Sequence, residues 1–122
     1  MNDDSRVYVA GHRGLVGSAI VRELRRLGYQ NLVVRSSTEL DLRRQDAVDA
    51  LFEQERPEVV DHHAAQMDVR RSVADPIFDA DVNILGSIKL AQLAVEFKTR
   101  KFIHISSGGA VYGEPVYLPC DE

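Results

Sequence analysis

Three glycines near the start of the chain, Gly11, Gly14 and Gly17, lie three residues apart in the stretch VAGHRGLVGSAI (9–20). They follow the apolar run RVYVA (6–10) and precede residues 15–27, whose apolar side chains recur with the period of a helix. A glycine turn between a strand and a helix lets phosphate groups approach the free N–H groups and the positive end of that helix. The pattern therefore predicts a pyrophosphate site for a dinucleotide, the alternative being a glycine turn without a ligand.

Two arginines bear on which dinucleotide that would be. Arg13 lies inside the glycine turn, and Arg35 ends the apolar run NLVVR (31–35) and is followed by Ser36 and Ser37. Sites for NAD usually place an acidic residue after the second strand, where it binds the ribose 2′-hydroxyl. A guanidinium with neighbouring hydroxyls instead suits a 2′-phosphate. The sequence predicts NADP(H) as the preferred cofactor, while NAD(H) remains an alternative, as does a solvated Arg35 without a ligand.

The elements that would position these residues alternate between short apolar runs and longer helical patterns. The predicted strands are 6–10, 31–35, the start of 58–65 and 101–107, and the predicted helices are 15–27, 45–55 and 78–98. This alternation predicts an α/β fold, a Rossmann-type doubly wound parallel sheet in one domain over 1–122. Residues 39–42 form either a very short strand or a loop, because no crossover helix fits between Arg35 and Glu39.

The composition is that of an ordinary soluble chain, with 122 residues, 44% hydrophobic and 28% charged. Its net charge of −4 argues against nucleic acid or an anionic membrane as a partner. The single cysteine, Cys120, excludes an internal disulfide framework, and no apolar run has the length of a membrane span. We therefore expect a cytoplasmic protein.

The G-x-x-G-x-x-G spacing resembles the extended short-chain dehydrogenase/reductase family of NAD-dependent epimerases and dehydratases. The string VAGHRGLVGSAIVREL is similar to the GDP-L-fucose synthase branch. In the second half, DHHAAQMDVRRSVADP, DVNILGSIKLAQLA and SSGGAVYGE resemble the UDP-glucose 4-epimerase branch. The resemblance covers nearly the whole chain, but no single branch claims both halves.

The glycine turn, the arginines and this resemblance together indicate which residues face the cofactor. The predicted cofactor-binding residues are Gly11, Arg13, Gly14, Leu15, Val16, Gly17, Arg35, Ser36, Asp41, Leu42, Ala64, Ala65 and Asn83. Asp41 has the alternative role of capping the next helix. Asn83, which the resemblance implies supports the active site, has the alternative role of satisfying buried backbone groups.

Other polar residues are less informative. His62 and His63 cannot share a metal ion, because neighbouring residues of a strand point to opposite faces, so we predict no metal site and a packed or hydrogen-bonded His62. Arg70 and Arg71 are candidates for a sugar-nucleotide phosphate, but solvated loop charges are the favoured interpretation.

The chemistry of the resembled family rests on a Tyr-x-x-x-Lys pair, in which lysine lowers the pKa of tyrosine. The four tyrosines of this chain are followed four residues later by His12, Val33, Val116 and Asp121, so the pair is missing. Ser107 is the one catalytic candidate. We expect the cofactor-binding part of a longer enzyme, without its substrate lobe, whose sheet is incomplete on the C-terminal side and leaves strand 101–107 at an exposed edge.

Three functions remain open. The first is the cofactor-binding part of an NADP(H)-dependent epimerase/reductase that acts on a nucleotide sugar, GDP-4-keto-6-deoxymannose. The second is a UDP-sugar 4-epimerase or sugar-nucleotide dehydratase, and the third is a dinucleotide-binding module without catalysis. Helix 78–98 is apolar nearly all round, which favours a homodimer through this helix, with burial inside a larger monomer as the alternative.

Overall fold

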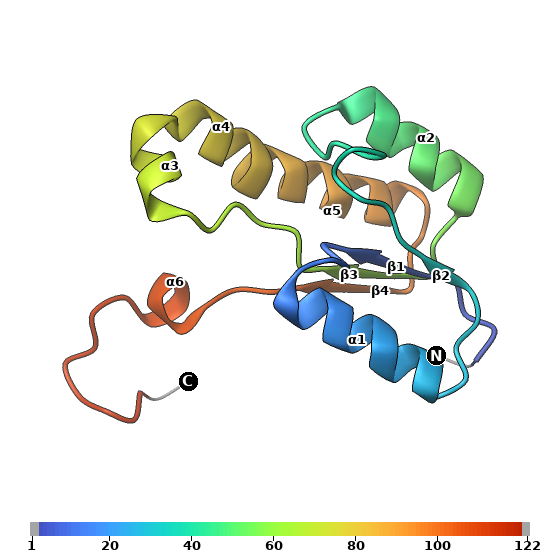
Figure 1. Ribbon diagram of the computed structural model, residues 1–122, viewed down its shortest axis with the longest axis horizontal. Coiled ribbons are helices and arrows are strands. Elements are labelled where there is room, and N and C mark those ends of the chain that lie inside the picture. The colour runs from blue at the N-terminus through green and yellow to red at the C-terminus, as the bar shows by residue number, and fades with distance from the viewer. Residues whose placement is uncertain (1–2, 121–122) are drawn as a thin grey trace.

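The computed structural model describes residues 3–120 and has one parallel sheet between two layers of helices (Figure 1). The strands are β1 (Val7–Ala10), β2 (Leu32–Val33), β3 (Val59–His62) and β4 (Lys101–His104), in the spatial order β2-β1-β3-β4. All three pairings are parallel, with Val7 opposite both Leu32 and Val59, and Val59 opposite Lys101. The predicted doubly wound α/β fold is confirmed.

The helices are divided between the two faces of the sheet. Helix α1 (Leu15–Arg26) covers one face, and α2 (Gln45–Glu55) and α5 (Gly86–Glu96) cover the other (Figure 1). Successive strand residues point to opposite faces, so β1 supplies Val7 and Val9 to the core under α1 and Tyr8 and Ala10 to the core under α2 and α5. Two hydrophobic cores therefore fix both layers against one sheet.

The predicted long helix after Pro76 is present, but it is not uniform. It consists of α4 (Pro76–Ala80), a π-helical segment η1 (Asp81–Leu85) and α5, which follow one another directly. The short helix α3 (Val69–Ala74) precedes it, where a loop was expected around Arg70 and Arg71. The Asp68 carboxylate caps α3 by accepting hydrogen bonds from the backbone N–H groups of Arg70 and Arg71, a local signal that explains this helix.

The strands are shorter than predicted, and residues 39–42 are not a strand. The N–H groups of Glu39 and Leu40 both donate to the carbonyl of Ser36, which closes a turn after β2. Residues 39–42 form turns and irregular backbone and pair with no strand, which settles the alternative in favour of a loop. Ala64 and Ala65 likewise lie in the loop after β3, not in the strand.

Strand β4 lies at one edge of the sheet, as expected, with its first and last residues exposed. Beyond it, the chain forms the short helix α6 (Gly108–Tyr112) and then extends away from the sheet (Figure 1). No helix among residues 3–120 is long and apolar enough to span a lipid bilayer.

Candidate dinucleotide site

A cleft of about 650 Å³ opens where β1, β2 and β3 end, and its walls are the loops that follow these strands. Such a position, beyond the carboxyl ends of parallel strands, is where open α/β sheets bind ligands. Of the predicted cofactor-binding residues, the cleft is lined by Gly11, Arg13, Gly14, Arg35, Ser36, Asp41, Leu42, Ala64 and Ala65. The fold thus brings together residues from three separate parts of the sequence.

The glycine turn forms the floor of this cleft. Gly11 has a φ of +85°, and a Cβ atom there would lie 2.7 Å from both the backbone N of Ala64 and the carbonyl C of His63. Gly17 is buried and packs directly on the carbonyl of Gly11, where a side chain would clash. Gly17 therefore allows α1 to pack closely against the glycine turn, and it does not line the cleft.

The N-terminus of α1 points its backbone donors out of this turn. Its N-cap residue, Gly14, has no side chain to accept hydrogen bonds, and the first turn holds no acidic residue. In contrast, α3, α4 and α6 are capped by the side chains of Asp68, Asp75 and Ser107. The first N–H groups of an α-helix have no acceptor within the helix, so this end of α1 is suited to an anion. Leu15 and Val16, the first two residues of α1, are 90% and 53% exposed and do not line the cleft.

Two arginines and Ser36 form the second polar wall. The Arg35 guanidinium donates to a Glu55 carboxylate oxygen at 2.6 Å and to the carbonyl of Val34 at 2.9 Å, so it is held at the end of β2. Arg13 extends from the glycine turn into the same cleft. Ser36 is only 4% exposed, and both its N–H group and its hydroxyl donate to Glu39. This wall is a cluster of donors and positive charge that suits a phosphate group.

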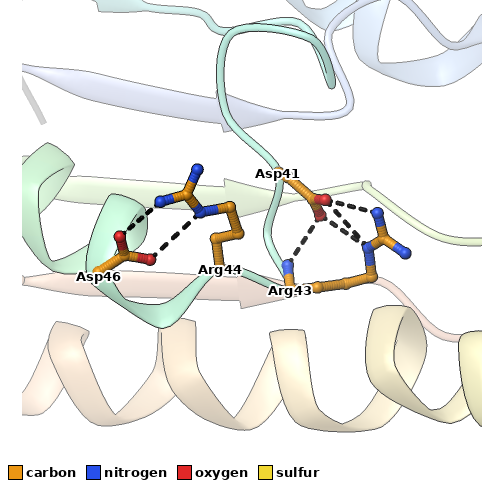
Figure 2. A network of polar contacts seen from close by, with 4 residues as sticks. All are labelled: Asp41, Arg43, Arg44 and Asp46. Carbon is orange, nitrogen blue, oxygen red and sulfur yellow. Dashed lines mark hydrogen bonds and ion pairs between the residues drawn. The ribbon is translucent and has the colours of Figure 1, made fainter.

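Asp41 does not cap helix α2, whose N-cap residue is Arg44 and whose N-terminus has no side-chain capping hydrogen bond. Instead, the Asp41 carboxylate accepts from the backbone and guanidinium N–H groups of Arg43, with a shortest distance of 2.6 Å (Figure 2). The Arg43 side chain is the main cause that holds the pKa of Asp41 below its usual value. Arg44 forms a separate ion pair with Asp46 at 2.7 Å (Figure 2).

Asn83, in the π-helical segment, lies outside the lining of the cleft but holds one wall in place. Its side-chain oxygen accepts from the N–H group of Gln66 at 2.8 Å, and its amide group donates to the Gln66 carbonyl at 2.9 Å. This two-way pairing fixes the loop that carries Ala64 and Ala65. Asn83 thus satisfies backbone groups of Gln66, a residue that lines the cleft, while its support of an active site stays a prediction.

The cleft also contains residues that the sequence did not indicate. Two guanidinium groups lie over the Phe78 ring, with the Cζ of Arg71 3.6 Å and the Cζ of Arg43 5.0 Å from the ring centroid. All three line the cleft. Arg71 is exposed, as expected for a solvated charge, but it lies in helix α3 and not in a loop. The i, i+7 spacing of Arg71 and Phe78 across two short helices gave no usable signal, because Asp75 and Pro76 interrupt the helical period.

The side chains of His62 and His63 are packed inside the protein. His62 is 2% exposed, and its Nε2 lies 2.8 Å from the hydroxyl of Ser87 on α5, which confirms the predicted hydrogen-bonded role. His63 points to the other face of the sheet, where its Nε2 lies 2.8 Å from a carboxylate oxygen of Asp61. Within residues 3–120, no group of three or more His, Cys, Asp or Glu side chains is placed to hold a metal ion.

Ser107 is the N-cap of α6, where its hydroxyl accepts from the N–H group of Ala110 at 3.2 Å. It is exposed and does not line the cleft. The predicted catalytic role of Ser107 therefore stays a prediction.

A parallel sheet whose first loop is a glycine turn, with a cleft at the strand ends, defines a Rossmann-type fold. Residues 7–122 match the model of the NAD dependent epimerase/dehydratase family, and the chain belongs to this family. The expected membership of the extended short-chain dehydrogenases/reductases is thereby confirmed.

Individual relatives are nucleotide-sugar enzymes of both expected branches. GDP-L-fucose synthase 1 from Arabidopsis thaliana is 41% identical over 111 residues, which are 88% of this chain and 34% of that protein. A GDP-D-glycero-L-gluco-heptose synthase from Campylobacter jejuni, solved in the presence of NADPH, is 30% identical with a TM-score of 0.90 over 99% of this chain and 35% of the solved one. UDP-glucose 4-epimerase from Thermus thermophilus, solved with NAD, is 33% identical with a TM-score of 0.83 over 96% of this chain and 42% of that chain.

This chain spans about two fifths of the length of other curated relatives as well, 42% and 43% for two of them.

Proposed function

We propose that the cleft binds NADP(H) and that the chain is the cofactor-binding part of a nucleotide-sugar epimerase/reductase. The observation that carries this proposal is the convergence, in one cleft, of the uncapped N-terminus of α1 with Arg13, Arg35 and Ser36. The first of these groups suits a pyrophosphate and the other three suit a second phosphate group. A dinucleotide with a 2′-phosphate carries both.

Each group of residues is assigned to one part of the cofactor. The N–H groups of Leu15 and Val16 hold the pyrophosphate, and Gly17 allows the close packing beneath the glycine turn. Arg13, Arg35 and Ser36 hold the 2′-phosphate, and Asp41 and Leu42 lie against the adenine. Ala64 and Ala65 leave room for the nicotinamide half, with Asn83 as the positioning residue behind them. When bound, the cofactor supplies the hydride, and the residues of this chain bind it and orient it.

The substrate proposed for the enzyme is GDP-4-keto-6-deoxymannose, which the reaction converts to GDP-fucose. The 41% identity to a GDP-L-fucose synthase supports this choice, as does the GHRG turn. The TM-score of 0.83 against a UDP-glucose 4-epimerase supports a second candidate, a UDP-sugar 4-epimerase. Ser107, the proposed catalytic contact of this chain, would act on the sugar.

One assay separates the candidates, because a reductase consumes its cofactor and a 4-epimerase does not. The protein that carries this sequence is incubated with NADPH and GDP-4-keto-6-deoxymannose, and with NAD and UDP-galactose, and absorbance of the reduced nicotinamide and sugar products are followed. Net oxidation of NADPH with the GDP sugar is expected. Epimerised UDP sugar without net oxidation favours the second candidate, and cofactor binding without any product favours a non-catalytic module.

The proposed assembly is a homodimer through residues 78–98. One side of this segment is buried on the sheet through Leu90, Leu93 and Ala94, while Ile84, Leu85, Ile88 and Val95 are 50–81% exposed. Such a continuous apolar face on the outside favours a partner surface. We further propose a cytoplasmic location, which suits a chain with one cysteine.

A further inference from the structure

The donors of Ser36 are already engaged by a negative charge from the chain itself. One carboxylate oxygen of Glu39, Oε2, accepts from the backbone N–H group of Ser36 at 2.7 Å and from the Ser36 hydroxyl at 2.6 Å. Ser36 is buried, whereas Glu39 reaches it from an exposed turn three residues later. These two short hydrogen bonds to one oxygen are the geometry of a bound anion.

The charges around Glu39 are those that would surround a phosphate. The hydrogen bonds from Ser36 lower the pKa of Glu39 most, and the positive charges of Arg13 and Arg35 lower it further. Arg13 comes from the turn after β1 and Arg35 from the end of β2, so the carboxylate faces cations from both loops. Glu39 is therefore held as an anion among the groups to which the proposed function assigns the 2′-phosphate.

We propose that Glu39, which does not line the cleft itself but bonds to the lining residue Ser36, is a specificity-determining residue. Its carboxylate takes the donors of the 2′-phosphate site and must release them when a 2′-phosphorylated dinucleotide binds. This inference rests on the proposed function, because it uses the same cleft and the same cofactor. Two negative groups cannot share one set of donors without repulsion, so the carboxylate and the phosphate compete for Ser36, Arg13 and Arg35.

The competition acts on only one of the two cofactors. NADPH has to displace the Glu39 carboxylate, and this lowers its net affinity. NADH carries a 2′-hydroxyl instead, which can donate a hydrogen bond to the same carboxylate with no displacement. Arg13 and Arg35 raise the affinity for NADPH relative to NADH. Glu39 reduces this difference in affinity, and its removal increases it.

The test compares Glu39→Gln with the wild type and with Glu53→Gln. The glutamine keeps an oxygen that can accept from Ser36, so the turn is preserved and only the charge is lost. Glu53 is exposed on α2 and outside the cleft, so its variant makes the same charge change elsewhere. Dissociation constants are measured by calorimetry for NADPH, NADH, adenosine 2′,5′-bisphosphate and 5′-AMP.

In Glu39→Gln, the affinity for NADPH and for the bisphosphate should rise about tenfold relative to NADH and 5′-AMP, as removal of a nearby like charge predicts. Glu53→Gln should leave the ratios unchanged. An unchanged or reduced ratio in Glu39→Gln overturns the inference while leaving the proposed function intact. A wild type that binds none of the four ligands overturns both.

A second measurement does not depend on a variant. The amide proton of Ser36 in the free wild type should follow the titration of Glu39 in NMR spectra, since the carboxylate accepts its hydrogen bond. Adenosine 2′,5′-bisphosphate should shift this resonance and abolish its dependence on Glu39, whereas 5′-AMP should leave that dependence in place. If the two nucleotides act alike on Ser36, Glu39 does not compete with the 2′-phosphate.

Discussion

Gly11 and Ala64 lie so close that a Cβ atom on Gly11 would come within 2.7 Å of the backbone N of Ala64. The Gly11 backbone also has a φ of +85°, which residues with a Cβ atom rarely adopt. The turn after β1 and the loop after β3 therefore meet without a side chain between them. This contact sets the depth of the cleft and explains the first glycine of the motif.

Gly11→Ala should lower the free energy of unfolding by roughly 2–4 kcal/mol, because it adds both a strained φ and a backbone clash. Chemical denaturation measures this change. Gly108→Ala is the matched control, since nothing lies within 4 Å of the Cβ position of Gly108. Equal stability of the two variants would contradict the close approach of the two loops.

Arg35→Asp should reverse the cofactor preference. The substitution replaces a cation of the proposed 2′-phosphate site by an anion, so the affinity for NADPH should fall at least about tenfold and NADH should bind more tightly. Arg25→Asp, which makes the same charge change on an exposed position of α1, should preserve the preference. Because Arg35 also pairs with Glu55, thermal unfolding should be recorded to confirm that the variant is folded. A preference that survives in Arg35→Asp argues against its assigned role.

Asn83→Ala should weaken cofactor binding without removing any residue that lines the cleft. The variant leaves the N–H and carbonyl groups of Gln66 without their partner, which costs about 1–3 kcal/mol of stability and loosens the loop of Ala64 and Ala65. Hydrogen exchange at Gln66 measures this loosening directly. Asn31→Ala is the control, because the Asn31 side chain donates to the carbonyl of Asp4 at an exposed position. An unchanged hydrogen-exchange rate at Gln66 would show that the loop of Ala64 and Ala65 keeps its conformation without Asn83.

His62 should make the stability depend on pH. Burial, followed by the nearby His104 and His63, lowers the pKa of His62 from 6.5 to about 4. The folded state thus binds the proton less readily than the unfolded state, so the contribution of neutral His62 is complete above pH 6.5 and is lost as the pH falls to about 4. Relative to His62→Gln, the wild type should lose up to roughly 3 kcal/mol across this range. If the free energy of unfolding changes with pH in the same way in both proteins, His62 does not cause the pH dependence.

The fold was predictable because its signals are local. The strand at 6–10, the glycine turn and the periodic helix after it each follow from neighbouring residues, and their alternation fixes the parallel sheet. The turn at 36–40 was not predictable, since it depends on hydrogen bonds to the Ser36 carbonyl that compete with strand pairing. The sequence predicted that Arg13 and Arg35 lie at the same site, and both do line the cleft. It named Arg71 as a candidate for a phosphate but gave no indication that Arg71 would lie over Phe78 in the cleft, because α3 and α4 are short and meet through a tertiary contact.

The central claim, a site for a 2′-phosphorylated dinucleotide, is tested most directly by titrating the wild-type chain with NADPH and with NADH under identical salt and pH. We expect NADPH to bind more tightly, because Arg13, Arg35 and Ser36 lie together at the proposed position of the 2′-phosphate, from which this phosphate would displace the Glu39 carboxylate. Equal affinity for the two cofactors, or tighter binding of NADH, would contradict it.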